Sequence, residues 1–211
     1  CKIFICHSSS INIISIYKKD NFQENICNMK ILILYASLEG QTKKIAEYIA
    51  QNLRNQNQEI NLASAKNMTE DLVLESFDGI MIGASVHMGS HPKFLKKLIK
   101  QHIDLLNEKP TAFFSVCMAV KNRLPEKQQE ARQYLEDFIH QTGWEPIAQQ
   151  TFAGAIKYSK YGYFVRLVMK QIAKKEGADT DTSRDYEYTD WDAVTEFANE
   201  FLLALENNIR Q

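Results

Sequence analysis

The stretch from Ile31 to Leu53 constrains the fold of this chain more than any other. It opens with an unbroken apolar run, Ile31–Leu34, passes through a short polar turn that holds Gly40, and then places apolar residues at helical spacing. An apolar run without polar alternation indicates a strand that is buried on both faces, as in a parallel sheet. The sequence therefore predicts a strand, a tight turn and a helix that begins at the carboxyl end of a central strand. The apolar helix positions are Ile45, Ala46, Ile49, Ala50 and Leu53.

The turn, residues 37–42, has the features of an anion site. The first N–H groups of a helix lack intrahelical partners and the helix dipole is positive there. Ser37 and Thr42 add hydroxyl groups, and Gly40 permits close approach of the backbone. Neither the lysine of an ATP or GTP loop nor the G-x-G-x-x-G of a dinucleotide fold is present. The pattern Ser37-x-x-Gly40-x-Thr42 resembles the FMN phosphate loop of flavodoxins. The alternative is a helix N-cap, made by Ser37 or Thr42, that binds no ligand.

The rest of the chain repeats the strand–helix pattern. It predicts an α/β fold: a flavodoxin-like, doubly wound, five-stranded parallel sheet in the order 2-1-3-4-5, over residues 29–207. The other predicted strands are residues 59–64, 80–85, 111–117 and 149–155. Three further helices are predicted. One begins near His91-Pro92 and has an inner stripe from Phe94 to Leu106. The second ends at Gly143, and the third begins at Thr189 or Asp190.

In this strand order a ligand lies where the loops after the first, third and fourth strands meet. Phosphoryl-accepting receiver domains share the topology, but they need acidic residues where Ser37 and Ser85 stand. We expect His87 and Met88 to pack against a flavin ring or a substrate; the alternatives are an exposed loop histidine and a packing methionine. Cys117 fits a small buried residue better than a redox group. The predicted cofactor-binding residues are Ser37, Leu38, Glu39, Gly40, Gln41, Thr42, Ser85, Val86, His87, Met88, Gly89, Ser115, Val116, Cys117, Met118, Ala119 and Gly154.

Composition excludes several other classes. A formal net charge of −1 over 211 residues gives no basic bias toward nucleic acid, and 45% hydrophobic residues is ordinary for a globular protein. The cysteines show no disulfide framework and no metal-ligand spacing, which fits a reducing, cytoplasmic setting. Residues 1–28 show no clean periodicity. Our hypothesis is that they form a leader outside the domain and that Met29 is the natural start.

An excursion of about residues 156–188 separates the last strand from the last helix. It predicts an amphipathic helical insertion that ends near Lys175, and no acidic residue occurs in residues 157–175. On a helical wheel the basic stripe Arg166, Lys170 and Lys174 lies away from an apolar face. That pattern suits an anionic membrane surface, a helix packed on the domain, or a partner site. The apolar face comprises Phe164, Val165, Val168, Met169 and Ile172.

Several segments together resemble the menaquinone-dependent protoporphyrinogen IX dehydrogenase family. They are Met29–Tyr35, Gly40–Thr42, Ile82–Ser85, Phe152–Ala155, Thr180–Thr182 and Tyr188–Trp191. The resemblance implies an FMN flavoprotein, peripheral on the cytoplasmic face of the bacterial inner membrane. It would oxidise protoporphyrinogen IX to protoporphyrin IX in haem biosynthesis, with a membrane quinone, menaquinone or ubiquinone, as acceptor.

For that function, Lys157, Lys160 or Arg166 would pair with the substrate propionates. Arg166, Lys170 and Lys174 would meet the membrane. Two features depart from flavodoxins: Glu39 stands where a second hydroxyl residue is usual, and the second loop has no aromatic residue. The alternatives are a quinone reductase fed by NAD(P)H, and a flavodoxin-like electron carrier or membrane-bound interaction domain. The residues assign no general base, and a homo-oligomer is left open.

Overall fold

The computed structural model describes residues 28–68, 72–122, 124–160, 162–175 and 177–209. Within these residues one five-stranded parallel sheet has the order β2-β1-β3-β4-β5, as predicted. The predicted leader lies outside the described residues except for its last residue. The strands are β1 (Lys30–Ala36), β2 (Glu59–Ser64), β3 (Gly79–Ser85), β4 (Thr111–Val116) and β5 (Ala148–Phe152).

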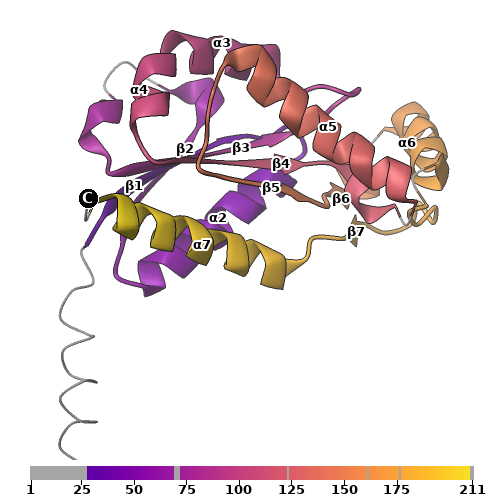
Figure 1. Ribbon diagram of the computed structural model, residues 1–211. Helices are drawn as coiled ribbons and strands as arrows, with labels where there is room; N and C mark the ends of the chain where they lie inside the picture. Colours follow the sequence, from indigo (N-terminus) through magenta and orange to yellow (C-terminus); the bar gives the residue numbers. More distant parts are fainter. Residues whose placement is uncertain (1–27, 69–71, 123, 161, 176, 210–211) are drawn as a thin grey trace, which may run out of the picture.

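Helices cover both faces of the sheet (Figure 1). Helices α2 (Gln41–Asn55) and α7 (Trp191–Ile209) pack on one face. Helices α3 (Lys93–Gln101), α4 (Ile103–Glu108) and α5 (Pro125–Thr142) pack on the other. No helix in the described part of the chain is both long and apolar enough to cross a membrane.

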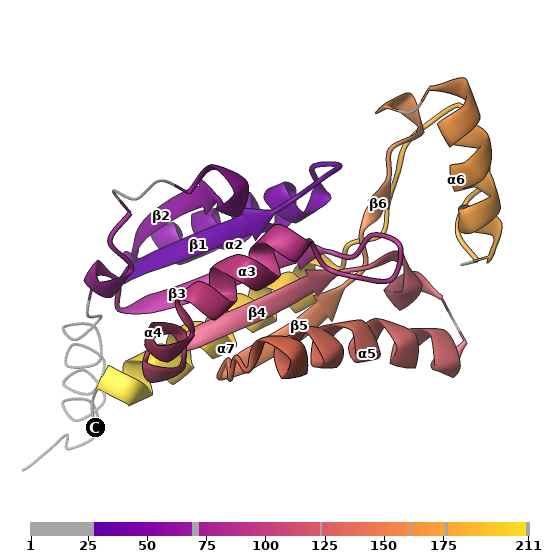
Figure 2. The same ribbon diagram turned by 90° about the horizontal axis from the view of Figure 1, so that it is seen from above.

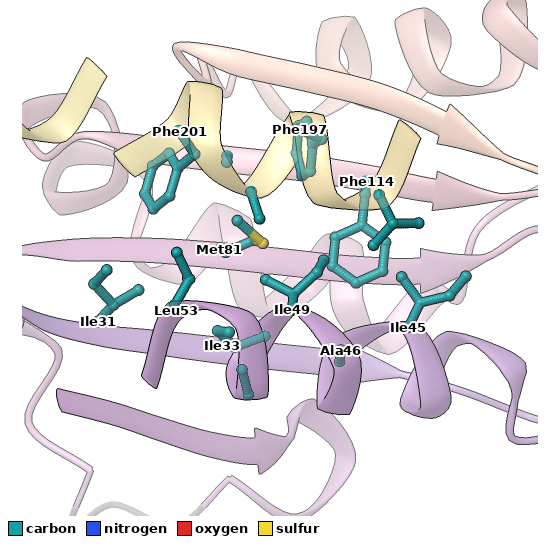
Figure 3. Packing of buried hydrophobic residues seen from close by; sticks show 14 of the residues in the cluster. Ile31, Ile33, Ile45, Ala46, Ile49, Leu53, Met81, Phe114, Phe197 and Phe201 are labelled. Carbon is teal, nitrogen blue, oxygen red and sulfur yellow. The ribbon is translucent and has the colours of Figure 1, made fainter. Parts of the chain in front are cut away.

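The unbroken apolar runs follow from this sandwich. Alternate residues of a strand point to opposite faces. Ile31 and Ile33 therefore belong to the cluster under α2 and α7, whereas Leu32 and Leu34 belong to the opposite cluster. Figure 3 shows the first cluster, in which Phe197 and Phe201 of α7 and the isoleucines of α2 lie on the same face of the sheet. Because helices cover both faces of the sheet, the polar residues of the site lie at the ends of the strands.

A close approach between two strands depends on Gly83. A Cβ at this position would lie 2.0 Å from the ring of Phe114, which is fully buried on the neighbouring strand β4. Glycine is the residue that leaves room for that ring. The Phe114 ring can therefore extend over Gly83 and pack in the cluster that contains Phe197 of α7.

The excursion is a small structure of its own beyond the carboxyl ends of the strands (Figure 2). Two short antiparallel strands, β6 (Ala155–Ile156) and β7 (Tyr186–Glu187), form a ribbon that leads to α6 (Tyr163–Lys175). Ile156, Tyr158 and Ala173 form its buried cluster, against which Met118 of the main domain packs. This arrangement places α6 next to the edge of the sheet where parallel-sheet ligands bind.

Some predicted elements differ from the structure. The helix expected over residues 91–106 is two helices, because the N–H of His102 bonds to the Ile99 carbonyl and ends α3, and Phe94 of the predicted stripe is exposed. The strand expected over residues 149–155 ends at Phe152, and Ala155 pairs instead with Glu187 in the ribbon. The predicted C-terminal glycine of α5 is confirmed, since Gly143 has a left-handed φ of 74°.

The helical wheel of the excursion was partly wrong. Met169 and Ala173 face the tyrosine-lined cluster, whereas Val168 and Ile172 of the predicted apolar face are exposed. Arg166, placed in the outward basic stripe, is half-buried, while Lys170 and Lys174 are exposed. The described part of α6 therefore presents an apolar surface of Leu167, Val168 and Ile172 to solvent, flanked by two lysines.

Candidate functional site

A pocket lies at the carboxyl ends of β1, β3 and β4, where the three predicted loops meet. Its enclosed volume of about 60 Å³ is below the roughly 300 Å³ of an ordinary cofactor pocket. A flavin-sized ligand would therefore extend out of it between the loops. The lining residues are Ser37, Glu39, Gln41, Thr42, Ser85, Val86, His87, Val116, Met118, Gly154 and Ala155.

The first loop leaves two buried polar atoms without a partner. Thr42 is 1% exposed and Gln41 is 5% exposed, yet Thr42 Oγ1 and Gln41 Oε1 make no hydrogen bond to any described residue. Such atoms destabilise a fold unless something pairs with them. Neither Ser37 nor Thr42 caps α2: no side chain bonds to the first turn, and Ser37 Oγ accepts the N–H of Gly40 at 3.0 Å. The N-cap alternative is therefore not what the structure shows.

Gly40 determines the path of this loop, whereas Leu38 is exposed outside the pocket. Gly40 has a φ of 95°, in the left-handed region that glycine adopts without strain. That turn directs the chain from β1 into α2, and the first N–H groups of the helix face the loop. Leu38 is 76% exposed and points away from the lining residues.

Gln41 also ties the loop to the end of the excursion. Its Nε2 donates to Thr189 Oγ1 at 3.0 Å, and the Thr189 hydroxyl donates to the Ala153 carbonyl at 2.9 Å. One helix turn later, Lys44 forms a 2.6 Å ion pair with Glu187 of β7. The start of α2, the end of β5 and the return from the excursion are therefore fastened at one point.

The second loop holds His87 in the pocket wall. The N–H of His87 donates to the Ser90 carbonyl at 2.9 Å, and the N–H of Ser90 donates back at 3.1 Å. Met88 and Gly89 complete this tight turn with φ values of 50° and 77°. Met88 is fully exposed at the tip, so the alternative of a methionine packed within the protein is wrong, and packing against a flavin stays a prediction. Ser85 Oγ lies 3.0 Å from His87 Nε2.

A second serine–histidine pair anchors the other end of this loop. His91 is 5% exposed, its Nε2 lies 2.9 Å from Ser115 Oγ, and its ring packs on Phe113 and Phe138. Burial, assisted by the nearby charge of Lys96, lowers the pKa of His91 from 6.5 to about 4. The imidazole is therefore neutral at physiological pH. Ser115 is held by this pair and does not line the pocket.

The third loop contributes less to the pocket than expected. Val116 and Met118 line it, whereas Cys117 and Ala119 pack in a separate cluster with Ala131 of α5. A Cβ at Gly154 would lie 3.3 Å from Val116 Cγ1, which is tighter than most contacts. Glycine at this position therefore lets the two lining residues lie close together.

The basic residues of the excursion are dispersed. Lys157 is half-buried, and the side chain of Lys160 lies outside the described structure. Among the described pocket-lining residues there is no lysine or arginine. Lys121 of the third loop also contacts the excursion, since its Nζ lies 4.8 Å from the centre of the Tyr188 ring.

Sequence reasoning missed three residues of this region. Ala155 lines the pocket because β5 ends early and the chain turns into the ribbon. Thr189 stands in the Tyr-Thr-Asp-Trp segment that carried the family resemblance, but a motif does not show a hydrogen bond to Gln41. His91 was recognised only as a helix start; its buried position follows from packing on Phe138, which lies 47 residues further along the chain.

The strand order and the glycine-containing, hydroxyl-bearing loop define a flavodoxin-like protein. The model of the flavodoxin domain matches residues 32–183. The oxidised flavodoxin 1 from Bacillus cereus aligns with a TM-score of 0.50 and 20% identity, over 82% of this chain and 97% of that one. A flavodoxin from Streptococcus pneumoniae aligns with a TM-score of 0.50 and 15% identity, over 85% and 99%. These likenesses concern the fold.

Curated relatives narrow the assignment. A protein of Escherichia coli K12 named protoporphyrinogen IX dehydrogenase [quinone] is 35% identical over 82% of this chain and 94% of its own length. A Leishmania major protein of the same name is 32% identical over 82% of this chain and 74% of its own. The chain therefore belongs to the protoporphyrinogen IX dehydrogenase (quinone) family, a family of flavodoxin-like oxidoreductases.

Proposed function

We propose that this protein binds FMN and oxidises protoporphyrinogen IX to protoporphyrin IX, with a membrane quinone as the electron acceptor, as a step of haem biosynthesis. The observation that carries the proposal is the pair of buried, unpartnered polar atoms, Gln41 Oε1 and Thr42 Oγ1, in the first loop. The substrate and acceptor are those in the names of the Escherichia coli and Leishmania major relatives.

The first loop fits the phosphate end of FMN. The Thr42 hydroxyl would donate to a phosphate oxygen, and the first N–H groups of α2 would donate beside it. Gln41 Oε1 is an acceptor, so it would accept a hydrogen bond from a hydroxyl group of the ribityl chain instead. FMN binding would therefore give both unpartnered atoms a hydrogen-bond partner, whereas a helix N-cap without a ligand leaves them unpaired.

The ring would lie toward the second and third loops. Val86, His87 and Met118 line that part of the pocket, together with Gly154. When bound, the flavin supplies the acceptor for the electron pair that leaves the substrate. The protein's own contribution is to hold the macrocycle against the ring and to receive protons. Lys157, Lys160 or Arg166 would pair with the propionates, as the resemblance suggests.

Helix α6 would dock the protein on the cytoplasmic face of the bacterial inner membrane. Leu167, Val168 and Ile172 are exposed together, 46%, 58% and 42%, and Lys170 and Lys174 flank them. An exposed apolar strip bordered by cations suits an anionic lipid surface. Both the lipid-soluble quinone and an apolar porphyrinogen would be available there.

The function is tested by adding protoporphyrinogen IX anaerobically to the FMN-loaded protein. We expect the oxidised flavin spectrum to bleach as porphyrin fluorescence appears. Flavin that stays oxidised here, but is rapidly reduced by NADPH, would replace the proposal with a quinone reductase. Absence of FMN binding even after reconstitution would contradict the assignment of the first loop.

A matched pair of variants localises the cofactor. Thr42→Val removes one hydroxyl and keeps the shape, so we expect FMN affinity to fall about tenfold or more, the loss of one hydrogen bond to a charged group. Thr195→Val, which makes a similar change on α7, is the control. Equal affinities in the two variants, measured by flavin fluorescence titration, would contradict the phosphate site.

Docking is tested with anionic vesicles. Replacing Lys170 and Lys174 by Glu should greatly reduce co-sedimentation of the protein with phosphatidylglycerol vesicles. Arg166 is left intact because it is half-buried. The control replaces Lys93 and Lys97 of α3 by Glu, the same change of charge at the same spacing on exposed positions. If both double variants sediment like the unmodified protein, α6 is not the docking element.

A further inference from the structure

His87 is a titratable group that faces the pocket and that the assigned roles leave unused. Among the described lining residues, only His87 and Glu39 carry an ionisable side chain. Glu39 belongs to the first loop, at the end of the pocket assigned to the phosphate. His87 belongs to the second loop and lies on the side where the ring and a substrate would meet. This placement, like the inference below, rests on the proposed function.

The backbone holds His87 firmly in place. Directly before it, the N–H of Val86 donates to the Val116 carbonyl at 2.9 Å and continues the β3–β4 pairing. Directly after it, the two reciprocal bonds with Ser90 close the turn at 2.9 and 3.1 Å. His91 then anchors the end of the loop in the core. A side chain carried between these fixed points can act at a defined position without a large rearrangement.

The contact with Ser85 indicates which nitrogen of the His87 imidazole carries the proton. The Ser85 Oγ lies between two groups, 3.0 Å from His87 Nε2 and 3.4 Å from the Ala36 carbonyl. A carbonyl can only accept, so a Ser85 hydroxyl that donates to Ala36 leaves its oxygen to accept from Nε2–H. The neutral imidazole then has its lone pair on Nδ1. Gaining a proton there leaves both existing hydrogen bonds intact.

The buried His91 does not compete for this role. His91 lies outside the pocket lining, with its ring between Phe113 and Phe138 and its Nε2 bonded to Ser115. Burial lowers the pKa of His91 to about 4, so it is a poor proton acceptor near neutral pH. Histidine is otherwise the side chain best suited to accept a proton in that range.

We propose that His87 is the catalytic base of the porphyrinogen oxidation and that Ser85 is its positioning residue. The reaction removes six hydrogens, four from the bridge carbons and two from pyrrole nitrogens, in three two-electron steps. In each step one bridge C–H bond breaks, and the flavin, when bound, would supply the acceptor for that hydrogen and its electron pair before the quinone. One proton also leaves the ring system in each step and bonds to His87 Nδ1, from a pyrrole nitrogen in two steps and from the fourth bridge carbon in the other. The half-exposed imidazole then returns that proton to water.

The first test compares His87→Gln with the unmodified holoenzyme. The glutamine amide can still donate to Ser85, but it cannot take up a proton. General bases contribute about 100-fold to 10,000-fold, so we expect anaerobic flavin reduction by protoporphyrinogen IX to slow by about 100-fold or more. FMN affinity, measured separately, should stay within about threefold. His140→Gln, on the exposed surface of α5, is the control.

A second variant separates proton transfer from mere packing. In His87→Ala, added imidazole should restore the rate, and a series of substituted imidazoles should restore it in order of basicity. A reduction rate in His87→Gln within about threefold of the unmodified protein overturns the proposal. So does an alanine variant that no imidazole rescues. If the unmodified protein itself fails to oxidise the porphyrinogen, the proposed function fails first.

The tautomer gives a readout that needs neither flavin nor substrate. Nitrogen-15 NMR of the flavin-free protein should show the proton of neutral His87 on Nε2. Ser85→Ala should shift the population toward the Nδ1–H form, because the acceptor for Nε2–H is gone. A neutral imidazole protonated at Nδ1 in the unmodified protein would overturn the assignment of Nδ1 as the proton acceptor, whatever the activity.

Discussion

The buried His91 predicts how the stability of this protein depends on pH. Its pKa is lowered from 6.5 to about 4 in the folded protein, first by burial and then by the charge of Lys96. Below 6.5 the unfolded chain takes up a proton on this imidazole, whereas the folded protein does so only near 4. The unfolded state therefore binds more protons in this window, and the free energy of unfolding falls as the pH falls.

The size of the effect follows from the two pKa values. Their full difference corresponds to about 3 kcal/mol, of which about 2 kcal/mol is lost between about pH 7 and about pH 4.5. His91 is 5% exposed, so solvent does not screen this cost strongly. Tyr134, Asp137 and Lys96 line the small pocket beside it.

The contribution of His91 is isolated by comparing the unmodified protein with His91→Gln. The glutamine amide can still reach Ser115 but does not titrate. Urea unfolding of both flavin-free proteins would be followed by fluorescence of the buried Trp144 at several pH values and constant ionic strength. Flavin is left out because a ligand that binds only the folded protein adds its own stability. We expect the unmodified protein to lose about 2 kcal/mol more than the variant between about pH 7 and about pH 4.5. Equal losses would refute the reasoning.

Two further predictions concern the fold around the site. Gly83→Ala should destabilise the protein by about 1 to 3 kcal/mol or prevent folding, because its Cβ would lie 2.0 Å from the buried ring of Phe114; an unchanged urea midpoint would contradict this. Thr189→Val should cost about 1 to 3 kcal/mol, because Gln41 Nε2 loses its acceptor and the Ala153 carbonyl loses its donor. Unfolding curves that superimpose on those of the unmodified protein would show that this link contributes nothing.

The main sheet was predictable because burial on both faces leaves a direct mark on the sequence. Ile31–Leu34 and Ile80–Ala84 are apolar without alternation, and both are buried strands of one parallel sheet. The turn from β1 into α2 was predictable because Gly40 supplies the left-handed conformation that it needs. Its role in phosphate binding stays a prediction, since hydroxyl residues and glycine at the start of a helix also serve as N-caps. His87 was found because the strand order brings the loop after β3 to the same edge.

The excursion was less predictable because tertiary contacts decide its shape. Strands of two residues, such as β6 and β7, carry no periodicity that a sequence pattern can reveal. On α6, apolar residues occur on more than one side of the helix, so the wheel alone does not say which side is buried. Tyr158 and Tyr186 settle this, since the cluster that they form takes Met169 and Ala173 and leaves Val168 in solvent.

The attachment of the excursion has a consequence for how such a protein can change over time. The N–H of Tyr188 bonds to the Gly154 carbonyl at 3.1 Å, so the segment leaves and rejoins the domain at one point. Neither of the two large hydrophobic clusters takes a residue from the part between them. Because the entropy of closing a loop grows slowly with its length, this segment can lengthen, shorten or be exchanged without disturbing the strand register. The length and sequence of the excursion can therefore vary while the sheet and the first loop beneath it stay constant.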